Sequence, residues 1–167
     1  MPETDKVYLV GFMGAGKSTL ARALGARLGW RVEDVDDRIE AREGRAVAEI
    51  FRDAGEGYFR AVERTVLAAL LPLRHAVVAA GGGTFVDPEN RAAMLADGTV
   101  VWLDVPVDVL VDRIPTDGRR PLAASRAELE RLYLARLAAY QLAHLRLDAS
   151  RAPVAELVER VLDRLGW

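Results

Sequence analysis

A glycine-rich stretch near the start of the chain contains the residues best suited to chemistry. The sequence GFMGAGKST, residues 11–19, matches the spacing G-x-x-x-x-G-K-[ST]. Glycines in such a loop let consecutive backbone N–H groups at the start of a helix surround the phosphates of a nucleotide. Lys17 then reaches the β and γ oxygens, and the Ser18 hydroxyl is a ligand for Mg²⁺. The motif predicts a phosphate-binding loop.

The lysine of this motif is unusual for this chain. Lys17 is one of two lysines among 23 lysines and arginines. A lysine ammonium is a compact charge, whereas the planar fork of arginine does not fit a narrow phosphate loop. We expect Lys17 to be an exposed loop side chain that binds phosphate. The alternatives are a chance match in a glycine-rich turn and a dinucleotide fingerprint, which would need a glycine where Thr19 stands.

Two carboxylates follow in the sequence EDVDDRIE. Asp34 and Asp36 are two residues apart, at the predicted end of a strand, where they can point to different sides. One would then face a metal ion near Ser18, because Mg²⁺ prefers oxygen ligands. The other would face the group that accepts a phosphate. The alternative is that both acids are solvated charges in the turn before a helix.

Two further features of the sequence, a run of three glycines and an arginine on a helix, could contribute to a site. Three consecutive glycines, Gly81–Gly83, follow a buried apolar run, so we expect some group to approach the backbone there, although a flexible loop is the alternative. Arg60, in GYFRAVE, lies on a predicted helix. Glu63 and Arg64 follow one turn later and can orient Arg60 or simply pair on the surface.

Short β-branched apolar runs alternate with amphipathic segments along the chain. Strands are predicted at 7–10, 76–80 and 99–105, with a weaker one at 30–36 and a fifth at 145–150. Helices are predicted at 18–28, 37–53, 56–71, 88–97, 107–113, 126–142 and 153–166, the fourth opened by Asp87 and Pro88. This alternation predicts an α/β fold with a parallel sheet. The carboxyl ends of the other strands would then share one edge with the phosphate loop.

Composition limits the possible functions. The 167 residues are 51% hydrophobic, which predicts one domain, 1–167. A formal net charge of -2 argues against sequence-independent binding of nucleic acid. No uncharged run approaches the roughly 18 residues of a membrane span, so we expect no membrane insertion. The chain has no cysteine and its first residues do not resemble a signal peptide, so we expect a cytoplasmic protein.

The ordered set of motifs resembles the shikimate kinase family. GFMGAGKST, D-x-D-x-x-I-E at 34–40, GEGYFRAVE, VVAAGGG, RRPL and RLAAY occur in the family's order over nearly the whole chain. The resemblance implies a P-loop NTPase fold with a nucleoside-monophosphate-kinase-like, parallel five-stranded sheet flanked by helices. It also implies a lid at about 114–125, which is the long irregular stretch IPTDGRRPLAAS, and an acceptor-binding region at about 34–64. The expected activity is ATP- and Mg²⁺-dependent phosphorylation of the 3-hydroxyl of shikimate, toward chorismate and the aromatic amino acids, by a monomer.

The resemblance also implies roles for individual residues. Asp36 would hold the acceptor hydroxyls and act as the candidate base, and Asp34 with Ser18 would hold the metal ion. Arg60 and Arg136 would bind the acceptor carboxylate. The ring would lie against Gly81, Gly82 and Gly83, and ATP would contact Gly14, Ala15, Gly16, Lys17, Ser18, Thr19, Arg113, Arg120 and Arg151. Arg120 of the lid would close over the transferring phosphate.

The sequence also departs from the family pattern and leaves rival functions open. Ala80 stands where relatives often carry Ser or Thr, and Ala138 where they often carry Pro. The choice of Arg120 over Arg119 depends on aligning the proline of RRPL. The rivals are another small-molecule kinase, acting on gluconate or a nucleoside monophosphate, and a non-catalytic or ATPase-type nucleotide-binding module. The acceptor-side arginines and Asp36 would be surplus in such a module.

Overall fold

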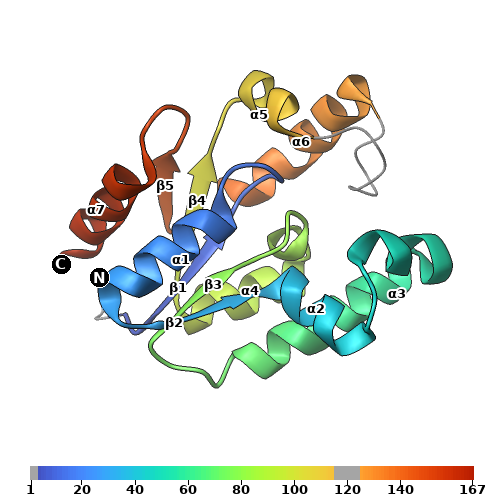
Figure 1. Ribbon diagram of the computed structural model, residues 1–167, viewed down its shortest axis with the longest axis horizontal. Helices are drawn as coiled ribbons and strands as arrows, with labels where there is room; N and C mark the ends of the chain where they lie inside the picture. Colours follow the sequence, from blue (N-terminus) through green and yellow to red (C-terminus); the bar gives the residue numbers. More distant parts are fainter. Residues whose placement is uncertain (1–3, 115–124) are drawn as a thin grey trace.

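A five-stranded parallel sheet forms the centre of the protein (Figure 1). The computed structural model describes residues 4–114 and 125–167. The strands are β1 (Lys6–Val10), β2 (Arg31–Asp34), β3 (Ala76–Ala79), β4 (Thr99–Asp104) and β5 (Leu145–Asp148), in the spatial order β2-β3-β1-β4-β5. All five predicted strands are therefore present. Because every pairing is parallel, the carboxyl ends of the strands lie at one edge of the sheet.

Helices cover both faces of this sheet. They are α1 (Lys17–Leu28), α2 (Val35–Glu43), α3 (Val47–Leu70), α4 (Pro88–Asp97), α5 (Val107–Arg113), α6 (Arg126–Tyr140) and α7 (Val154–Leu165), with a 3-10 helix η1 (Thr84–Val86). The connection from β1 to β2 crosses the sheet in one direction, and the connections from β2 through β3 and β4 to β5 cross it in the opposite direction. Because such crossovers are right-handed, α1 lies on one face of the sheet and α3, α4 and α6 lie on the other. α7 packs beside α1 (Figure 1). None of the helices in the described residues is long and apolar enough to cross a membrane.

The central strand positions the phosphate loop. β1 lies between β3 and β4, and its residues Val7–Val10 are fully buried. Its backbone is paired on both sides, with Leu9 opposite Ala79 of β3 and Val101 of β4. The loop that follows Val10 therefore starts from a rigid point in the middle of the carboxyl edge.

Lys6, the other lysine of the chain, has a structural role at the opposite edge of the sheet. Lys6 is fully buried, and its Nζ donates hydrogen bonds to the carbonyls of Leu70 at 2.6 Å and Leu71 at 3.1 Å. The same Nζ lies 2.6 Å from the carboxylate of Asp97, which also accepts a 2.6 Å hydrogen bond from the Tyr8 hydroxyl. Burial lowers the pKa of Lys6, and the hydrogen bond to Asp97 opposes this shift. Lys6 thus ties the ends of α3 and α4 to β1.

The predicted helix over 37–53 is wrong as a continuous element. Gly44 ends α2 in a left-handed conformation, with φ 67° and its N–H bonded to the carbonyl of Glu40. α3 then begins at Val47 and continues through the next predicted helix, 56–71, with a kink at Gly55 (φ 85°, ψ 170°). Glycine adopts such positive φ values without the steric cost that other residues pay. The break and the kink let this part of the chain fold around a pocket.

Candidate active site

The loop after β1 has a conformation that suits phosphate binding. Gly11, Gly14 and Gly16 all have positive φ, of 148°, 81° and 99°. A Cβ atom on Gly11 would lie 2.8 Å from the carbonyl oxygen of Leu103, so only glycine lets the loop pass β4 this closely. Gly16 is the N-cap of α1. The unpaired N–H groups of the first helical turn therefore lie at the loop, where they attract anions.

Lys17 is buried, which contradicts the prediction of an exposed loop side chain. It is the first residue of α1 and is 8% exposed. Its Nζ donates hydrogen bonds to the carbonyls of Gly11 at 2.7 Å and Phe12 at 3.0 Å. The side chain therefore folds back across the loop instead of extending into solvent. These carbonyls hold the ammonium in one place within the loop.

Ser18 and Asp34 meet beside the loop. The Ser18 hydroxyl donates a 2.6 Å hydrogen bond to Oδ2 of Asp34, while Oδ1 accepts the backbone N–H of Asp37 at 3.2 Å. Asp34 is both the last residue of β2 and the N-cap of α2, so its position is fixed by two elements. Within the described residues, no group of three or more His, Cys, Asp or Glu side chains forms a metal-binding cluster. One hydroxyl and one carboxylate are the donors expected for Mg²⁺ that takes its other ligands from phosphates and water.

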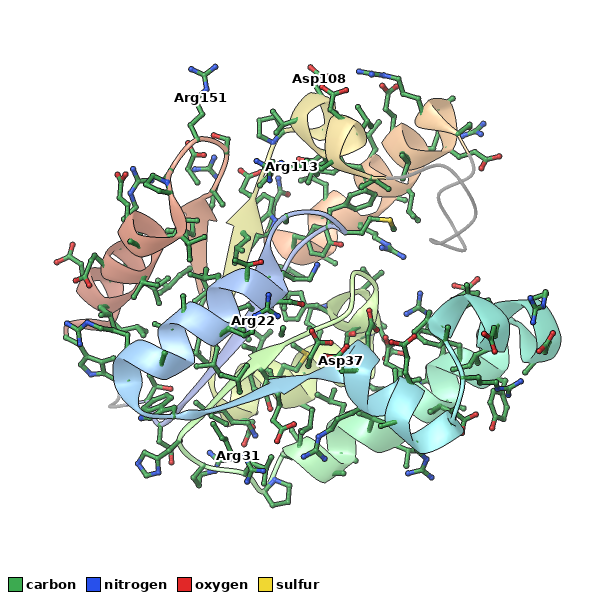
Figure 2. All side chains as sticks on the ribbon, viewed as in Figure 1. Arg22, Arg31, Asp37, Asp108, Arg113 and Arg151 are labelled. Atoms are coloured by element: carbon green, nitrogen blue, oxygen red, sulfur yellow. The ribbon has the colours of Figure 1, made fainter. Side chains whose placement is uncertain are left out.

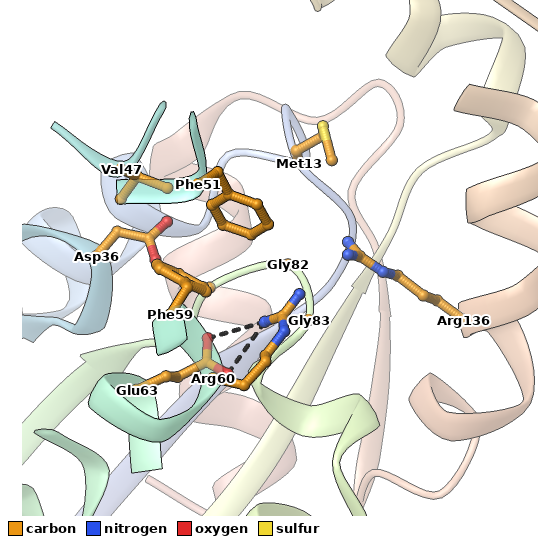
Figure 3. Close-up of a pocket in the computed structure, with 11 residues that line it drawn as sticks. Met13, Asp36, Val47, Phe51, Phe59, Arg60, Glu63, Gly82, Gly83 and Arg136 are labelled. Carbon is orange, nitrogen blue, oxygen red and sulfur yellow. Dashed lines mark hydrogen bonds and ion pairs between the residues drawn. The ribbon is translucent and has the colours of Figure 1, made fainter. Parts of the chain in front are cut away.

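Asp36 lines a pocket next to the phosphate loop, which we call the Asp36 pocket (Figure 3). The pocket is lined by Met13, Asp36, Val47, Phe51, Phe59, Arg60, Glu63, Gly81, Gly82, Gly83 and Arg136. Asp36 lies in the first turn of α2, and Asp34 does not line this pocket. Both carboxylates line the space at the phosphate loop with Lys17 and Ser18, and Asp36 also faces the Asp36 pocket. Apolar side chains and four charged side chains line the same small space.

The segment Gly81–Gly83, called the glycine segment below, is where the charged groups approach the backbone. A Cβ on its first residue would lie 2.8 Å from Oδ1 of Asp36. On the second it would lie 2.9 Å from a terminal guanidinium nitrogen of Arg136, and on the third 2.6 Å from one of Arg60. Any side chain in the segment would displace one of these charges. The prediction that some group approaches the backbone here is confirmed.

Arg60 is held in place by a buried acid. One guanidinium nitrogen donates to both carboxylate oxygens of Glu63, at 3.0 and 3.2 Å, and Glu63 is 1% exposed. The Thr84 hydroxyl donates a further 3.0 Å hydrogen bond to Glu63. Arg64 instead pairs with Asp87, outside the pocket. Of the two neighbours that the sequence offered, Glu63 is therefore the residue that orients Arg60.

Arg136 enters the same pocket from the other side. It lies on α6, is 5% exposed, and extends toward the glycine segment opposite Arg60 (Figure 3). Its guanidinium carbon lies 5.8 Å from the ring centre of Phe12. Within 4–114 and 125–167, no acidic side chain lies within ion-pair distance of Arg136. A buried charge is costly without a counter-charge, so this end of the pocket is suited to an anion.

The remaining predicted nucleotide contacts have different outcomes. Arg113, at the end of α5, donates a 3.4 Å hydrogen bond to the carbonyl of Gly14 in the phosphate loop. Arg151 is exposed and points outward from the loop between β5 and α7 (Figure 2). Arg119 and Arg120, with nearly all of the predicted lid, lie outside the described residues.

Both departures from the family pattern lie in regular backbone. Ala80 follows β3, and its N–H donates to the carbonyl of Leu9 at 3.0 Å. Ala138 lies inside α6, which is continuous from Arg126 to Tyr140. The helix that carries Arg136 is thus defined without the proline.

Several residues in or beside the pocket were not predicted as site residues, because no sequence pattern distinguishes them. Val47, Phe51 and Phe59 are apolar residues on a helix, and such residues are usually part of the core. Met13 stands at a variable position of the phosphate-loop motif. Tyr140 belongs to RLAAY, and its hydroxyl donates a 2.5 Å hydrogen bond to the carbonyl of the second residue of the glycine segment.

Comparison with known sequences gives one family. The family model described as shikimate kinase matches residues 13–166 of the chain. The shikimate kinase of Persephonella marina is 39% identical over 160 residues, which cover 95% of this chain and 98% of the relative. The shikimate kinase of Microcystis aeruginosa is 42% identical over 160 residues, covering 93% of this chain and 84% of the relative.

Solved structures agree with this comparison. A shikimate kinase from Acinetobacter baumannii in complex with shikimate matches with a TM-score of 0.92 at 33% identity, covering 97% of this chain and 93% of that chain. A gluconokinase from Sinorhizobium meliloti covers 99% of this chain and 94% of its own, with a TM-score of 0.60. A deoxyadenosine kinase from M. mycoides covers 96% and 98%, with a TM-score of 0.62. Both of these are 18% identical to this chain, so they share its fold alone.

Proposed function

The chain belongs to the shikimate kinase family, and we propose that it transfers the γ-phosphoryl group of ATP to the 3-hydroxyl of shikimate. The observation that carries this proposal is the buried guanidinium of Arg136, which has no acidic partner among the described residues and lies in the same pocket as the carboxylate of Asp36. A pocket with these two groups is suited to a small acid that also carries hydroxyls. Its position beside the phosphate loop supports phosphoryl transfer to one of those hydroxyls.

Arg60 and Arg136 bind the carboxylate of shikimate. They reach the glycine segment from α3 and α6, so a carboxylate between them receives hydrogen bonds from two directions (Figure 3). Charge-assisted hydrogen bonds of this kind are each worth about 1.5 to 3 kcal/mol. Glu63 offsets much of the charge of Arg60, whereas Arg136 has no such partner in the described residues. The charge that shikimate neutralises is therefore mainly that of Arg136.

Asp36 holds the hydroxyl groups of the acceptor. It accepts their hydrogen bonds, keeps the 3-hydroxyl in line with the γ-phosphorus and takes its proton late in the transfer. The ring lies against the glycine segment, and the apolar walls of the pocket exclude water. Exclusion of water favours transfer to shikimate over hydrolysis of ATP.

The phosphate loop binds the nucleotide. The backbone N–H groups of Gly14 to Thr19 surround the phosphates, and Lys17 neutralises charge on the transferring group. Arg113 and Arg151 flank the adenine. Arg120 comes over the transferring phosphate when the lid closes.

The oxygen donors beside the loop fit Mg²⁺. Ser18 would hold the ion directly and Asp34 would hold it through water, because Mg²⁺ usually keeps several of its waters and the two groups lie side by side, 2.6 Å apart. When bound, Mg²⁺ neutralises charge on the β- and γ-phosphates. We further propose that the protein is a single kinase domain, 1–167, and acts as a monomer in the cytoplasm.

The different roles of the two aspartates can be tested with Mg²⁺ titrations. We expect Asp34→Asn to raise the Mg²⁺ concentration needed for half-maximal rate, because an amide is a weaker partner for a hydrated cation than a carboxylate. Asp36→Asn should leave this concentration unchanged, since Asp34, and not Asp36, accepts the hydrogen bond from the Ser18 hydroxyl. Initial rates at saturating ATP and shikimate provide the measurement. Identical Mg²⁺ curves for wild type and Asp34→Asn would refute the metal role.

The carboxylate contact can be tested by changing the protein and the ligand together. Arg136→Ala should lower kcat/KM for shikimate about 10- to 150-fold, the equivalent of one charge-assisted hydrogen bond, with little change in ATP binding. The methyl ester of shikimate should cost wild type a similar factor and cost the variant much less. The coupling between the two changes isolates the contact from general damage.

The same experiment has a matched control variant and an outcome that would refute the carboxylate contact. Arg64→Ala removes an arginine from the same helix as Arg60, but one that pairs with Asp87 outside the pocket. The methyl ester should lower kcat/KM of this variant by the same factor as it does for wild type. If the methyl ester lowers kcat/KM of Arg60→Ala and of Arg136→Ala by the same factor as it does for wild type, the carboxylate is bound elsewhere.

A further inference from the structure

The glycine segment, Gly81–Gly83, has no side chains of its own to fix its conformation. Its first and last carbonyls accept hydrogen bonds from the turn that follows, from the N–H of Thr84 at 3.2 Å and the N–H of Val86 at 3.1 Å. The carbonyl of Gly82 has a different partner, because it accepts a hydrogen bond from the hydroxyl of Tyr140 at 2.5 Å. A distant residue on α6 therefore fixes the middle of the segment.

Tyr140 is itself firmly held. It is fully buried, and its ring is stacked on Trp102 of β4 with centroids 6.2 Å apart and an interplanar angle of 24°. Burial raises the pKa of the Tyr140 hydroxyl to about 12, although the nearby Arg136 guanidinium opposes the shift. The hydroxyl therefore keeps its proton and remains a donor at neutral pH.

Tyr140 also lies one helical turn after Arg136, on the same helix. Gly82 is thus placed between two groups of α6: its carbonyl accepts from Tyr140, and its Cα faces the guanidinium of Arg136. The carbonyl of Gly82 and the N–H of Gly83 belong to one planar peptide and point in opposite directions. The bond from Tyr140 therefore sets the orientation of the peptide between Gly82 and Gly83, two residues that line the Asp36 pocket.

We propose that Tyr140 is a positioning residue for the acceptor. Its hydroxyl fixes the peptide between Gly82 and Gly83 against α6, so that this peptide and Arg136 keep one arrangement in which shikimate binds. Tyr140 does not line the pocket and acts through these two groups. The inference rests on the proposed function. It predicts an effect on acceptor binding and little effect on ATP binding or on the rate at saturation.

Tyr140→Phe tests this role, because it removes the hydroxyl and keeps the ring that packs on Trp102. Loss of a neutral hydrogen bond should raise KM for shikimate about 3- to 12-fold. We expect kcat and KM for ATP to remain close to wild type, and binding of shikimate measured by calorimetry without ATP to weaken by the same factor as KM. Tyr133→Phe is the matched control. It makes the same change on the same helix, at a ring that contacts Phe12 edge-on, and should leave KM for shikimate unchanged.

The outcomes separate this inference from the proposed function. An equal KM for shikimate in Tyr140→Phe and Tyr133→Phe, in an active enzyme, would overturn the positioning role alone. A parallel loss in kcat, both KM values and the free energy of unfolding would also overturn it, since that pattern indicates only a structural role. A wild-type protein that does not phosphorylate shikimate would instead refute the proposed function.

Discussion

Replacement of Lys17 by alanine is expected to abolish nearly all turnover, with kcat lowered by at least about 10²-fold. The ammonium is held by the carbonyls of Gly11 and Phe12 at the point where the phosphates bind, so it stabilises charge that develops during transfer. Lys17→Arg should be almost as damaging, because the wide guanidinium does not fit the position of a buried, compact ammonium. Steady-state kinetics with saturating ATP, Mg²⁺ and shikimate measures the effect.

The other lysine provides a matched control. Lys6→Met removes an equally buried ammonium from the opposite edge of the sheet, where it pairs with Asp97. We expect this change to lower the free energy of unfolding by about 3 kcal/mol, because it breaks a buried ion pair. Its kcat should remain near wild type at temperatures where the protein is folded. A Lys17→Ala enzyme within about tenfold of wild type would contradict the phosphate-loop account.

Asp36→Asn is expected to lower kcat by about 10²- to 10⁴-fold, the range for loss of a positioned general base. The amide occupies the same space, so the close contact with Gly81 is kept and the acceptor still enters the pocket. The variant lacks the carboxylate that we propose takes the proton of the 3-hydroxyl. Single-turnover measurement of shikimate 3-phosphate formation separates this step from binding and product release.

The neighbouring residue offers the control for this variant. Asp37→Asn makes the same chemical change on the same helical turn, but Asp37 is exposed and does not line the Asp36 pocket. It should leave kcat unchanged. Equal losses in the two variants would show that the helix tolerates no change of charge, and would remove the evidence for Asp36 as the base.

The sequence predicted the parts of the site that depend on short-range patterns. The phosphate loop could be placed because its glycines, lysine and serine have a fixed spacing that one conformation requires. Asp34 was correctly expected at the end of a strand, whereas Asp36 lies in the first turn of α2 and not on the same strand end. β1, β3 and β4 followed from apolar runs that are buried on both faces of the sheet, whereas β2 and β5 are partly exposed and had weaker signals.

Features that depend on tertiary contacts could not be predicted. The break at Gly44 was missed because the amphipathic pattern continues across this glycine, whereas the predicted helices 37–53 and 56–71 left a gap at Gly55, where α3 is kinked. The burial of Lys17 depends on how its side chain folds back over the loop. Tyr140 resembles any core aromatic residue in the sequence, and only the fold brings its hydroxyl to Gly82.

The most direct test of the central claim is the choice of acceptor. A coupled assay of ADP release should be run on the wild-type protein with Mg²⁺ and ATP, and with shikimate, quinate, gluconate and a nucleoside monophosphate side by side. We predict rapid ADP release with shikimate, a product phosphorylated on the 3-hydroxyl, and only background release with gluconate or the nucleotide. ADP release that is independent of any acceptor, or that is fastest with gluconate or the nucleoside monophosphate, would contradict the account.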